Sequence, residues 1–243
     1  EKKFYLVGYK DDVPLISSFN PATGKIINYY GAPIKDKQAF LGFSGNGGTY
    51  CWIEPGFKET FWIGSTDNGI YGFNMAAEKF VKVPITHLCK SANHFESFYS
   101  VMEDHAGNLW TTNDNNEVVY YNTERKKFYF FPIQKKFSQV GGMASFIYED
   151  RNHKIWIANL DGLITIDTDQ KNIYSTQHDD DDQFSISGNF VSSINRVANT
   201  LFVNSQRCQE FDKNKNQFRD PNFLKKLNTF KIFSVETDKK GLI

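Results

Sequence analysis

A seven-residue hairpin pattern recurs five times along this chain. Each copy opens with Asn or Asp and reaches an apolar residue six positions later, at residues 20–26, 74–80, 122–128, 167–173 and 212–218. The side chain of Asn or Asp can hydrogen-bond to its own backbone two residues on, and so it starts a turn. The copies begin 54, 48, 45 and 45 residues apart. Self-similarity at about 40 to 50 residues, with strands rather than helices in each unit, is typical of a β-propeller.

A second repeat lies upstream of the hairpins. An aromatic residue near the start of a strand recurs at intervals of 48, 46 and 46, as Trp62, Trp110, Trp156 and Phe202. Before it lies another strand, which ends in Glu-Asp at 103–104 and at 149–150. Three residues before the aromatic stand Gly107, His153 and Asn199, types that tolerate the positive φ of a tight hairpin.

Each full unit therefore predicts four strands, and the fold class is all-β: a β-propeller of four-stranded antiparallel blades over residues 1–243. The predicted units are a partial one to about 40, then 41–88, 89–135, 136–184 and 185–225, and a partial one over 226–243. A four-stranded sheet cannot bury both faces alone, so neighbouring blades must stack on large aromatics. We expect Trp110 and Trp156 to be buried between adjacent sheets.

Charge and cysteine content narrow the class of protein. Lys+Arg and Asp+Glu both number 28, and zero net charge argues against nucleic acid or an anionic membrane as a partner. No apolar run approaches the roughly 18 residues of a membrane helix. From the sequence we also expect no signal peptide before Glu1. Three cysteines exclude a full disulfide framework, and we expect Cys51 and Cys208, both in predicted strands, to be buried free thiols.

Clusters of charged residues have structural explanations. The acidic run at 179–182 could bind calcium, but it lacks the spacing and glycine of an EF-hand loop, which favours a solvated connection between blades. The Glu-Asp pairs at 103–104 and 149–150 look like acid–base carboxylates, but they recur at the same place in successive units, which favours turn capping.

Motifs of catalysis and metal binding are missing from the sequence. The five histidines show no metal-ligand spacing, and there is no nucleophile elbow, phosphate-binding glycine loop or CxxC. We therefore predict no catalytic residue, no metal and no cofactor, although propeller enzymes assemble their sites from residues scattered over several blades.

The segments 61–70, 97–110 and 145–158 resemble the two-component regulator propeller repeat, and 179–194 resembles that family's connection between blades. The chain departs from the pattern in its first unit and at two later positions. There, Arg196 stands where an Asp is expected and Phe202 replaces Trp. The resemblance implies the periplasmic sensor of a hybrid two-component histidine kinase of Bacteroidetes type, responding to a glycan fragment. Any kinase activity would lie outside this region.

Two other functions stay open, a propeller glycoside hydrolase or polysaccharide lyase and a non-catalytic interaction scaffold. The resemblance also implies seven-bladed propellers, so further blades or domains of the same receptor are expected partners. The strand predicted at 232–235 could close a five-bladed ring onto residues 4–8, but an open portion of a larger propeller is favoured.

In a propeller, the loops entering the innermost strands and those joining the second and third strands share one face, here named the loop face. Amides, carboxylates and an Arg there can hydrogen-bond to sugar hydroxyls, and a Phe can stack on a sugar ring. The candidate ligand-binding residues are Asn93, His94, Phe95, Asn113, Asp114, Asn159, Asp161, Phe190, Gln206 and Arg207. The same face also carries Asp67, Asn68, Gly142, Met143 and Asn189. An oligosaccharide or other small ligand, or a homodimer contact, would use it. The opposite, hairpin face carries the Glu-Asp and Asn/Asp turns.

Overall fold

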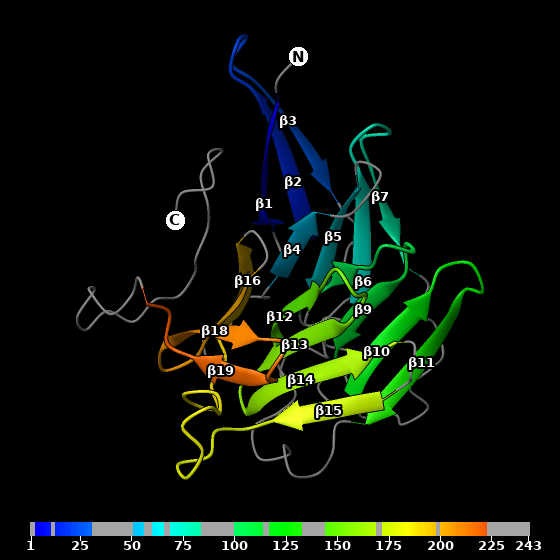
Figure 1. The fold of residues 1–243 in the computed structure, drawn as a ribbon. Helices are drawn as coiled ribbons and strands as arrows, with labels where there is room; N and C mark the ends of the chain where they lie inside the picture. The colour runs from blue at the N-terminus through cyan, green and yellow to red at the C-terminus, as the bar shows by residue number, and fades with distance from the viewer. Residues whose placement is uncertain are drawn as a thin grey trace, which may run out of the picture. The chain divides into compact units, whose positions relative to one another are not determined.

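The structure is a computed structural model with all side chains. It describes residues 3–10, 13–30, 51–55, 60–65, 69–83, 100–113, 117–132, 144–168, 172–197 and 200–222. The regular elements of this part of the chain are all strands, which form five sheets in which each strand pairs with the next one along the chain (Figure 1). The described residues contain no helix of the length and hydrophobicity needed to cross a membrane.

The first sheet has three strands and the other four sheets have four strands each. The first sheet consists of β1 (Phe4–Lys10), β2 (Val13–Asn20) and β3 (Lys25–Tyr30). The second consists of β4 (Cys51–Pro55), β5 (Thr60–Ser65), β6 (Gly69–Asn74) and β7 (Lys79–Lys82). The third consists of β8 (Met102–Glu103), β9 (Leu109–Thr112), β10 (Glu117–Asn122) and β11 (Lys127–Pro132).

The fourth sheet consists of β12 (Ala144–Glu149), β13 (Ile155–Asn159), β14 (Gly162–Asp167) and β15 (Asn172–Thr176). The fifth consists of β16 (Ser193–Val197), β17 (Thr200–Asn204), β18 (Cys208–Asp212) and β19 (Gln217–Arg219). The prediction of an all-β chain built from repeated four-stranded sheets is confirmed.

The chain divides into two compact units. The first comprises Glu1–Asp114 and Val119–Phe130, and the second comprises Asn115–Val118 and Phe131–Ile243. The first three sheets lie mainly in the first unit, and the fourth and fifth sheets lie in the second.

Side-chain bonds to the backbone hold four of the repeated Asn/Asp hairpins, and two of them have the predicted spacing of two residues. Asn20 Oδ1 accepts from the N–H of Ala22 at 2.9 Å, and Asp212 Oδ1 accepts from the N–H of Asn214 at 3.1 Å. At Asn74 and Asn122 the same oxygen accepts from the third residue on, at 2.7 Å in each case. The fifth residue of each of these four turns has positive φ, at Gly24, Glu78, Lys126 and Asn216.

The Glu-Asp hairpins explain why Trp recurs. Asp104 and Asp150 each accept from two backbone N–H groups of their own turn through Oδ1. Through Oδ2 they accept the indole N–H of Trp110 at 2.9 Å and of Trp156 at 3.0 Å. Gly107 and His153 have positive φ, of 82° and 59°, as predicted, and Asn199 lies outside the described residues. Turn capping is thus confirmed as the role of these two carboxylates.

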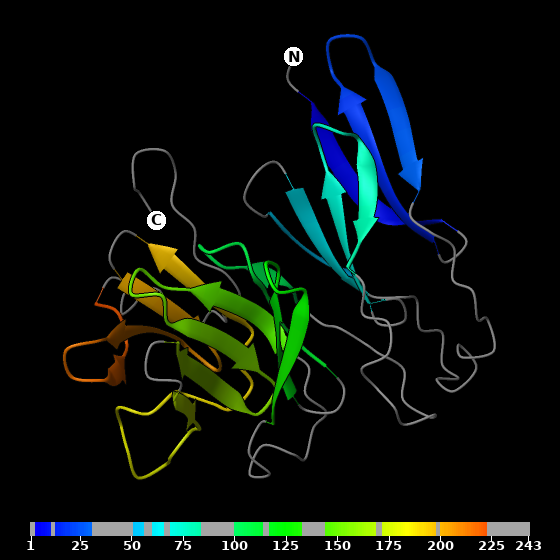
Figure 2. The same ribbon diagram turned by 90° about the vertical axis from the view of Figure 1, so that its right-hand side faces the viewer.

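In the first unit, the first and second sheets lie side by side (Figure 2). Clusters of aromatic and aliphatic side chains join neighbouring sheets. Ile16 of the first sheet packs with Ile63, Tyr71 and Phe73 of the second. Ile70 and Val83, on and beside the second sheet, form another cluster with residues of the third, namely Val101, Leu109, Val119 and Tyr121. Trp62 packs against this second cluster.

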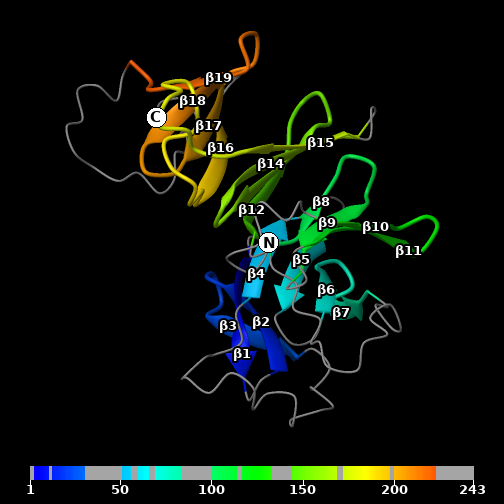
Figure 3. The same ribbon diagram turned by 90° about the horizontal axis from the view of Figure 1, so that it is seen from below.

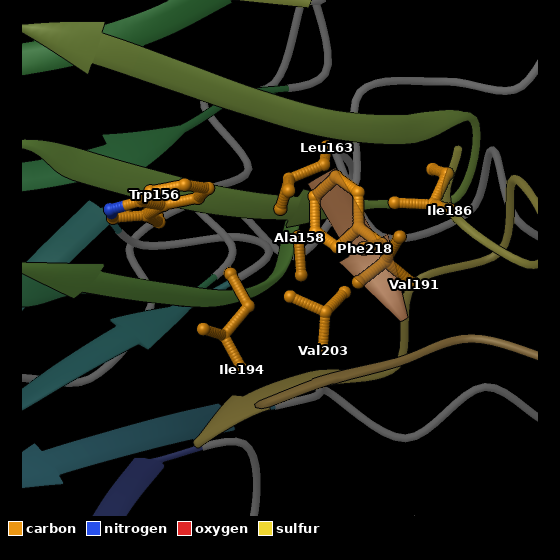
Figure 4. Close-up of a cluster of buried hydrophobic side chains, with 8 residues drawn as sticks. All are labelled: Trp156, Ala158, Leu163, Ile186, Val191, Ile194, Val203 and Phe218. Atoms are coloured by element: carbon orange, nitrogen blue, oxygen red, sulfur yellow. The ribbon is translucent and has the colours of Figure 1, made fainter. Parts of the chain in front are cut away.

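In the second unit, the fourth and fifth sheets lie side by side (Figure 3) and share one core. Trp156, Ala158 and Leu163 of the fourth sheet pack with Ile194, Val203 and Phe218 of the fifth (Figure 4). Trp156 also meets Phe211 edge to face, with ring centroids 4.9 Å apart. Trp110 and Trp156 are each only 4% exposed, so their predicted burial is confirmed. Trp156 further lies between adjacent sheets, as expected.

Strand pairing corrects the alignment of the fifth unit. By spacing from the aromatic residue, Arg196 stands in the place of Asp104 and Asp150. In the ladder, however, Arg196 pairs with Leu201, as Glu103 pairs with Leu109 and Glu149 pairs with Ile155. Arg196 therefore occupies the Glu position, because the β16–β17 hairpin is shorter than its counterparts.

Candidate functional site

The predicted ligand-binding residues are partly described by the structure. Asn93, His94, Phe95 and Asp114 lie outside the described residues, as do Asp67, Asn68, Gly142, Met143 and the segment 232–235. Asn113 belongs to the first unit, and the remaining predicted residues, Asn159, Asp161, Phe190, Gln206 and Arg207, belong to the second. We therefore build the candidate site on the loop face of the second unit.

The connection between β15 and β16 is ordered by a chain of polar contacts. The backbone N–H of His178 donates to Asn189 Oδ1 at 2.6 Å, and His178 Nδ1 donates to the carbonyl of Ile186 at 2.6 Å. The N–H of Ser187 donates to Gln209 Oε1 at 2.6 Å, which ties the connection to β18. Asn189, which the sequence placed on the loop face, thus holds the connection through its side chain.

Gln206 and Arg207 sit on this connection. The backbone N–H of Arg207 donates to Ser187 Oγ at 2.9 Å, while its guanidinium Nε lies 3.5 Å from Asp220 Oδ1. Gln206 covers Gly188 so closely that a Cβ on Gly188 would lie 2.6 Å from Gln206 Cγ. Both residues are nevertheless exposed, and Phe190 is 54% exposed. These three side chains are the predicted residues of this unit that a ligand can reach most easily.

The predicted asparagines, in contrast, are buried. Asn113 is 3% exposed and Asn159 is 0% exposed. The carbonyl of Asn159 accepts from the N–H of Val191 at 3.1 Å, and Asp161, which is half-buried, donates its N–H to Asn159 Oδ1 at 3.4 Å. Asn159 therefore does not face solvent, and it bonds instead to the segments at Asp161 and Val191.

Asn204 is a residue of this site that sequence reasoning missed. It is 0% exposed, and its carbonyl accepts from the N–H of Ser192 at 2.8 Å, one residue after the contact of Asn159. Its Nδ2 donates to Ser193 Oγ at 2.8 Å, but Asn204 Oδ1 and Asn159 Nδ2 have no hydrogen-bond partner among the described residues. The available signal was that Asn113, Asn159 and Asn204 each stand at the end of the strand that carries the repeated aromatic.

One hollow of the second unit lies on the hairpin face. We name it the intersheet pocket: a cavity of about 240 Å³ between the fourth and fifth sheets, lined chiefly by Tyr148, Trp156, Arg196, Leu201, Phe211 and Lys213. An outer groove of about 690 Å³ adjoins it and is lined chiefly by Thr165, Tyr174, Gln177, Asp179, Asp182 and Phe218. The predicted loop-face residues line neither hollow.

The acidic run at 179–182 serves the local backbone. Asp179 Oδ1 accepts from the N–H of Asp181 at 3.0 Å, and Asp182 Oδ1 accepts from the N–H of Phe184 at 2.9 Å. The carboxylates are exposed. These contacts match the preferred interpretation of the run as a solvated connection.

Cys208 is a free, buried cysteine, as expected. Burial, helped by the charge of Asp220, raises the pKa of this thiol to about 11. Such a thiol is protonated at neutral pH and is a poor nucleophile. Cys51 lies in β4, as predicted, while Cys89 lies outside the described residues.

No protein-family model matches the chain, and no curated protein matches its sequence. Solved structures do match. The extracellular domain of BT4673, described as a hybrid two component system of B. thetaiotaomicron, matches with a TM-score of 0.62 at 15% identity, over 96% of this chain and 31% of that one. The extracellular domain of BT3049 from the same organism, also described as a hybrid two component system, matches with a TM-score of 0.57 at 14% identity, over 90% and 30%.

A propeller of a different kind matches as well. The WD40 repeats of RRP9 match with a TM-score of 0.55 at 11% identity, over 88% of this chain and 61% of that one. Of the two B. thetaiotaomicron domains, in contrast, this chain spans under a third of the length. At these identities the likeness concerns the fold, and the fold of this chain is a β-propeller whose blades are the antiparallel sheets described above.

Proposed function

We propose that this chain is the ligand-sensing propeller region of an extracytoplasmic two-component receptor, and that it responds to a glycan fragment. The observation that carries the proposal is the fold match, over 96% of this chain, to an extracellular domain of a two component system. The repeat motifs at 61–70, 97–110 and 145–158 independently resemble the propeller repeat of such sensors. In this proposal the chain lies in the periplasm, and the membrane span, the kinase and further blades belong to the rest of the receptor.

The loop face of the second unit has the chemistry for sugar binding. Phe190 offers an exposed ring for the apolar face of a sugar, and Arg207 and Gln206 offer donors for its hydroxyls. The backbone beneath them is held by Ser187, Asn159 and Asn204. A preorganised backbone lowers the entropic cost of ligand binding.

Calorimetric titration with a panel of neutral and acidic oligosaccharides tests this function. We expect binding of at least one oligosaccharide without any release of product. Phe190→Ala and Arg207→Ala should each weaken that binding by about tenfold, the loss of roughly 1.4 kcal/mol. Arg219→Ala is a matched control, since Arg219 is also half-exposed and paired with carboxylates, 2.8 Å from Glu210 and 3.3 Å from Asp212.

The possible outcomes separate the rival functions. Product release that persists after purification to homogeneity would replace the sensor with a glycoside hydrolase or lyase. Binding of proteins but of no oligosaccharide would favour a scaffold. Equal affinity in the wild type, Phe190→Ala and Arg207→Ala proteins would remove the loop face of this unit from the site.

A further inference from the structure

The intersheet pocket gathers positive charge in a chain that has no net charge. Arg151, Lys154, Arg196 and Lys213 line it, and Asp150 supplies the single carboxylate among the described lining residues. Over the whole chain, by contrast, 28 basic residues balance 28 acidic ones. The pocket is therefore a local cationic site of the second unit.

The one carboxylate at the pocket is already engaged. Asp150 Oδ1 accepts from the backbone N–H groups of Asn152 at 2.8 Å and Lys154 at 3.1 Å, and Oδ2 accepts from Trp156 Nε1 at 3.0 Å. These three donors spread its negative charge into the hairpin. An anion in the pocket would therefore interact mainly with the positively charged side chains.

One ladder position differs in charge between the two pairs of sheets, the second with the third and the fourth with the fifth. In the first pair, Glu103 stands at the ladder position next to the turn and accepts the indole N–H of Trp62, from the preceding sheet, at 2.6 Å. Between the fourth and fifth sheets the equivalent position holds Arg196, which cannot accept a hydrogen bond. The indole N–H of Trp156 bonds to Asp150 on its own sheet, as that of Trp110 bonds to Asp104. Figure 4 shows this nitrogen at the end of the ring that points away from the rest of the hydrophobic cluster.

A buried donor completes the pocket. The hydroxyl oxygen of Tyr148 is buried and makes no hydrogen bond of good geometry among the described residues, although the guanidinium of Arg196 lies near enough to interact with it. Burial raises the pKa of Tyr148, and Arg196 acts in the opposite direction, so the hydroxyl keeps its proton at neutral pH. A buried polar group without a partner costs free energy, which a ligand can recover by bonding to it.

We propose that the intersheet pocket binds a small oxyanion, a carboxylate, phosphate or sulfate group, between Arg196, Lys213 and the hydroxyl of Tyr148. A guanidinium presents paired donors that match the oxygens of such groups, and lysine adds a point charge. The volume of about 240 Å³ suits a single such group or a monosaccharide acid. This site is separate from the loop face and does not depend on the proposed sensing of glycans.

Calorimetric titration at constant ionic strength tests the proposal, with phosphate, sulfate, acetate and glucuronate as probes and glucose as the uncharged comparison. We expect at least one oxyanion to bind with millimolar or better affinity, and glucose not to bind. Arg196→Gln should weaken binding by about tenfold or more, and Lys213→Gln by about threefold to tenfold, as expected for charge-assisted bonds.

Lys215→Gln is the matched control, because Lys215 lies in the same hairpin as Lys213 but does not line the pocket. Thermal unfolding of each variant confirms that the fold is retained. Strongest binding of glucuronate would identify a sugar acid as the source of the oxyanion, and strongest binding of phosphate or sulfate would identify a free ion. Absence of binding by all four anions, or equal losses in Lys213→Gln and Lys215→Gln, would overturn the proposal.

Discussion

The indole N–H of Trp62 donates a 2.6 Å hydrogen bond to the carboxylate of Glu103, which lies on the following sheet. Trp110 and Trp156, at the same position of later repeats, donate instead to Asp104 and Asp150 of their own hairpins. No acidic residue stands six positions before Trp62, where Gly56 is found. The repeat therefore satisfies one buried donor in two ways, locally where an Asp is present and across sheets where it is not.

Removing the carboxylate of Glu103 should destabilise the first unit. Glu103→Ala leaves the indole N–H of Trp62 without this partner, and we expect a loss of about 1–3 kcal/mol in the free energy of unfolding. Glu103→Gln keeps an acceptor and should lose less. Urea denaturation measures both, with Glu124→Ala, at an exposed position of the neighbouring hairpin, as the control. Equal stability of Glu103→Ala and the wild type would mean that water replaces the contact.

Truncation of the buried tryptophans should be among the most damaging changes. Trp110→Ala and Trp156→Ala each empty a space left by a side chain that is 4% exposed, and we expect losses of about 3–5 kcal/mol. Trp156→Phe keeps much of the packing against Phe211 and should lose less. Phe190→Ala, at a position 54% exposed, should change stability by under about 0.5 kcal/mol. A loss below about 1 kcal/mol for both tryptophans would contradict this account of the core.

Two glycines should respond differently to a methyl group. A Cβ on Gly72 would lie 2.9 Å from Cζ3 of Trp62, whose ring packs between the second and third sheets. We expect Gly72→Ala to cost about 1–3 kcal/mol through overpacking. A Cβ on Gly188 would meet the flexible, exposed side chain of Gln206, which can move, so Gly188→Ala should cost less. Chemical denaturation of the two variants side by side decides the order, and the reverse order would refute the argument.

The buried thiol of Cys208 should make stability depend on alkaline pH. Because burial raises its pKa to about 11 in the folded state, the unfolded thiol ionises first as the pH rises. Its stabilising contribution is complete below the pKa of the unfolded thiol, near 8.5, and is lost as the pH rises towards 11. Unfolding curves at pH 8, 9.5 and 10.5 should show a decline that is smaller in Cys208→Ala.

Alkylation provides an independent check on Cys208. Iodoacetamide at pH 8, followed by peptide mapping, should label this residue slowly in the folded chain and rapidly in urea, because the thiolate is the reactive form. Rapid labelling of Cys208 in the folded chain would contradict its burial.

Much of the fold could be predicted from the sequence because its signals are local. The Asn/Asp turns, the Asp caps of the Trp hairpins and the positive φ at Gly107 and His153 depend on bonds between residues a few positions apart. Such bonds require particular residue types at fixed spacing, so a repeat in the sequence predicts a repeat in the structure. The burial of Trp110 and Trp156 follows from the same logic, because stacked sheets need large apolar side chains between them.

The candidate site was harder to predict. Asn113 and Asn159 end strands in loop-forming sequences, which suggested exposure, yet both are buried under the loops. Whether a strand-end amide faces solvent or supports a neighbouring segment depends on where a distant connection crosses it. Here the N–H of Val191 bonds to the carbonyl of Asn159, 32 positions away, and the N–H of Ser192 bonds to the carbonyl of Asn204, 12 positions away.

The sequence by itself determined that the repeat is an antiparallel sheet, how many strands a full repeat has and how its turns are held. These features depend on neighbours along the chain. Tertiary structure alone decided what lies between the sheets. The partner of Trp62, the ladder position of Arg196 and the cationic pocket beside Tyr148 depend on hairpin length and on side chains 40 or more residues apart. Contacts across such distances leave no fixed spacing in the sequence, since packing is set by shape and volume rather than by order along the chain.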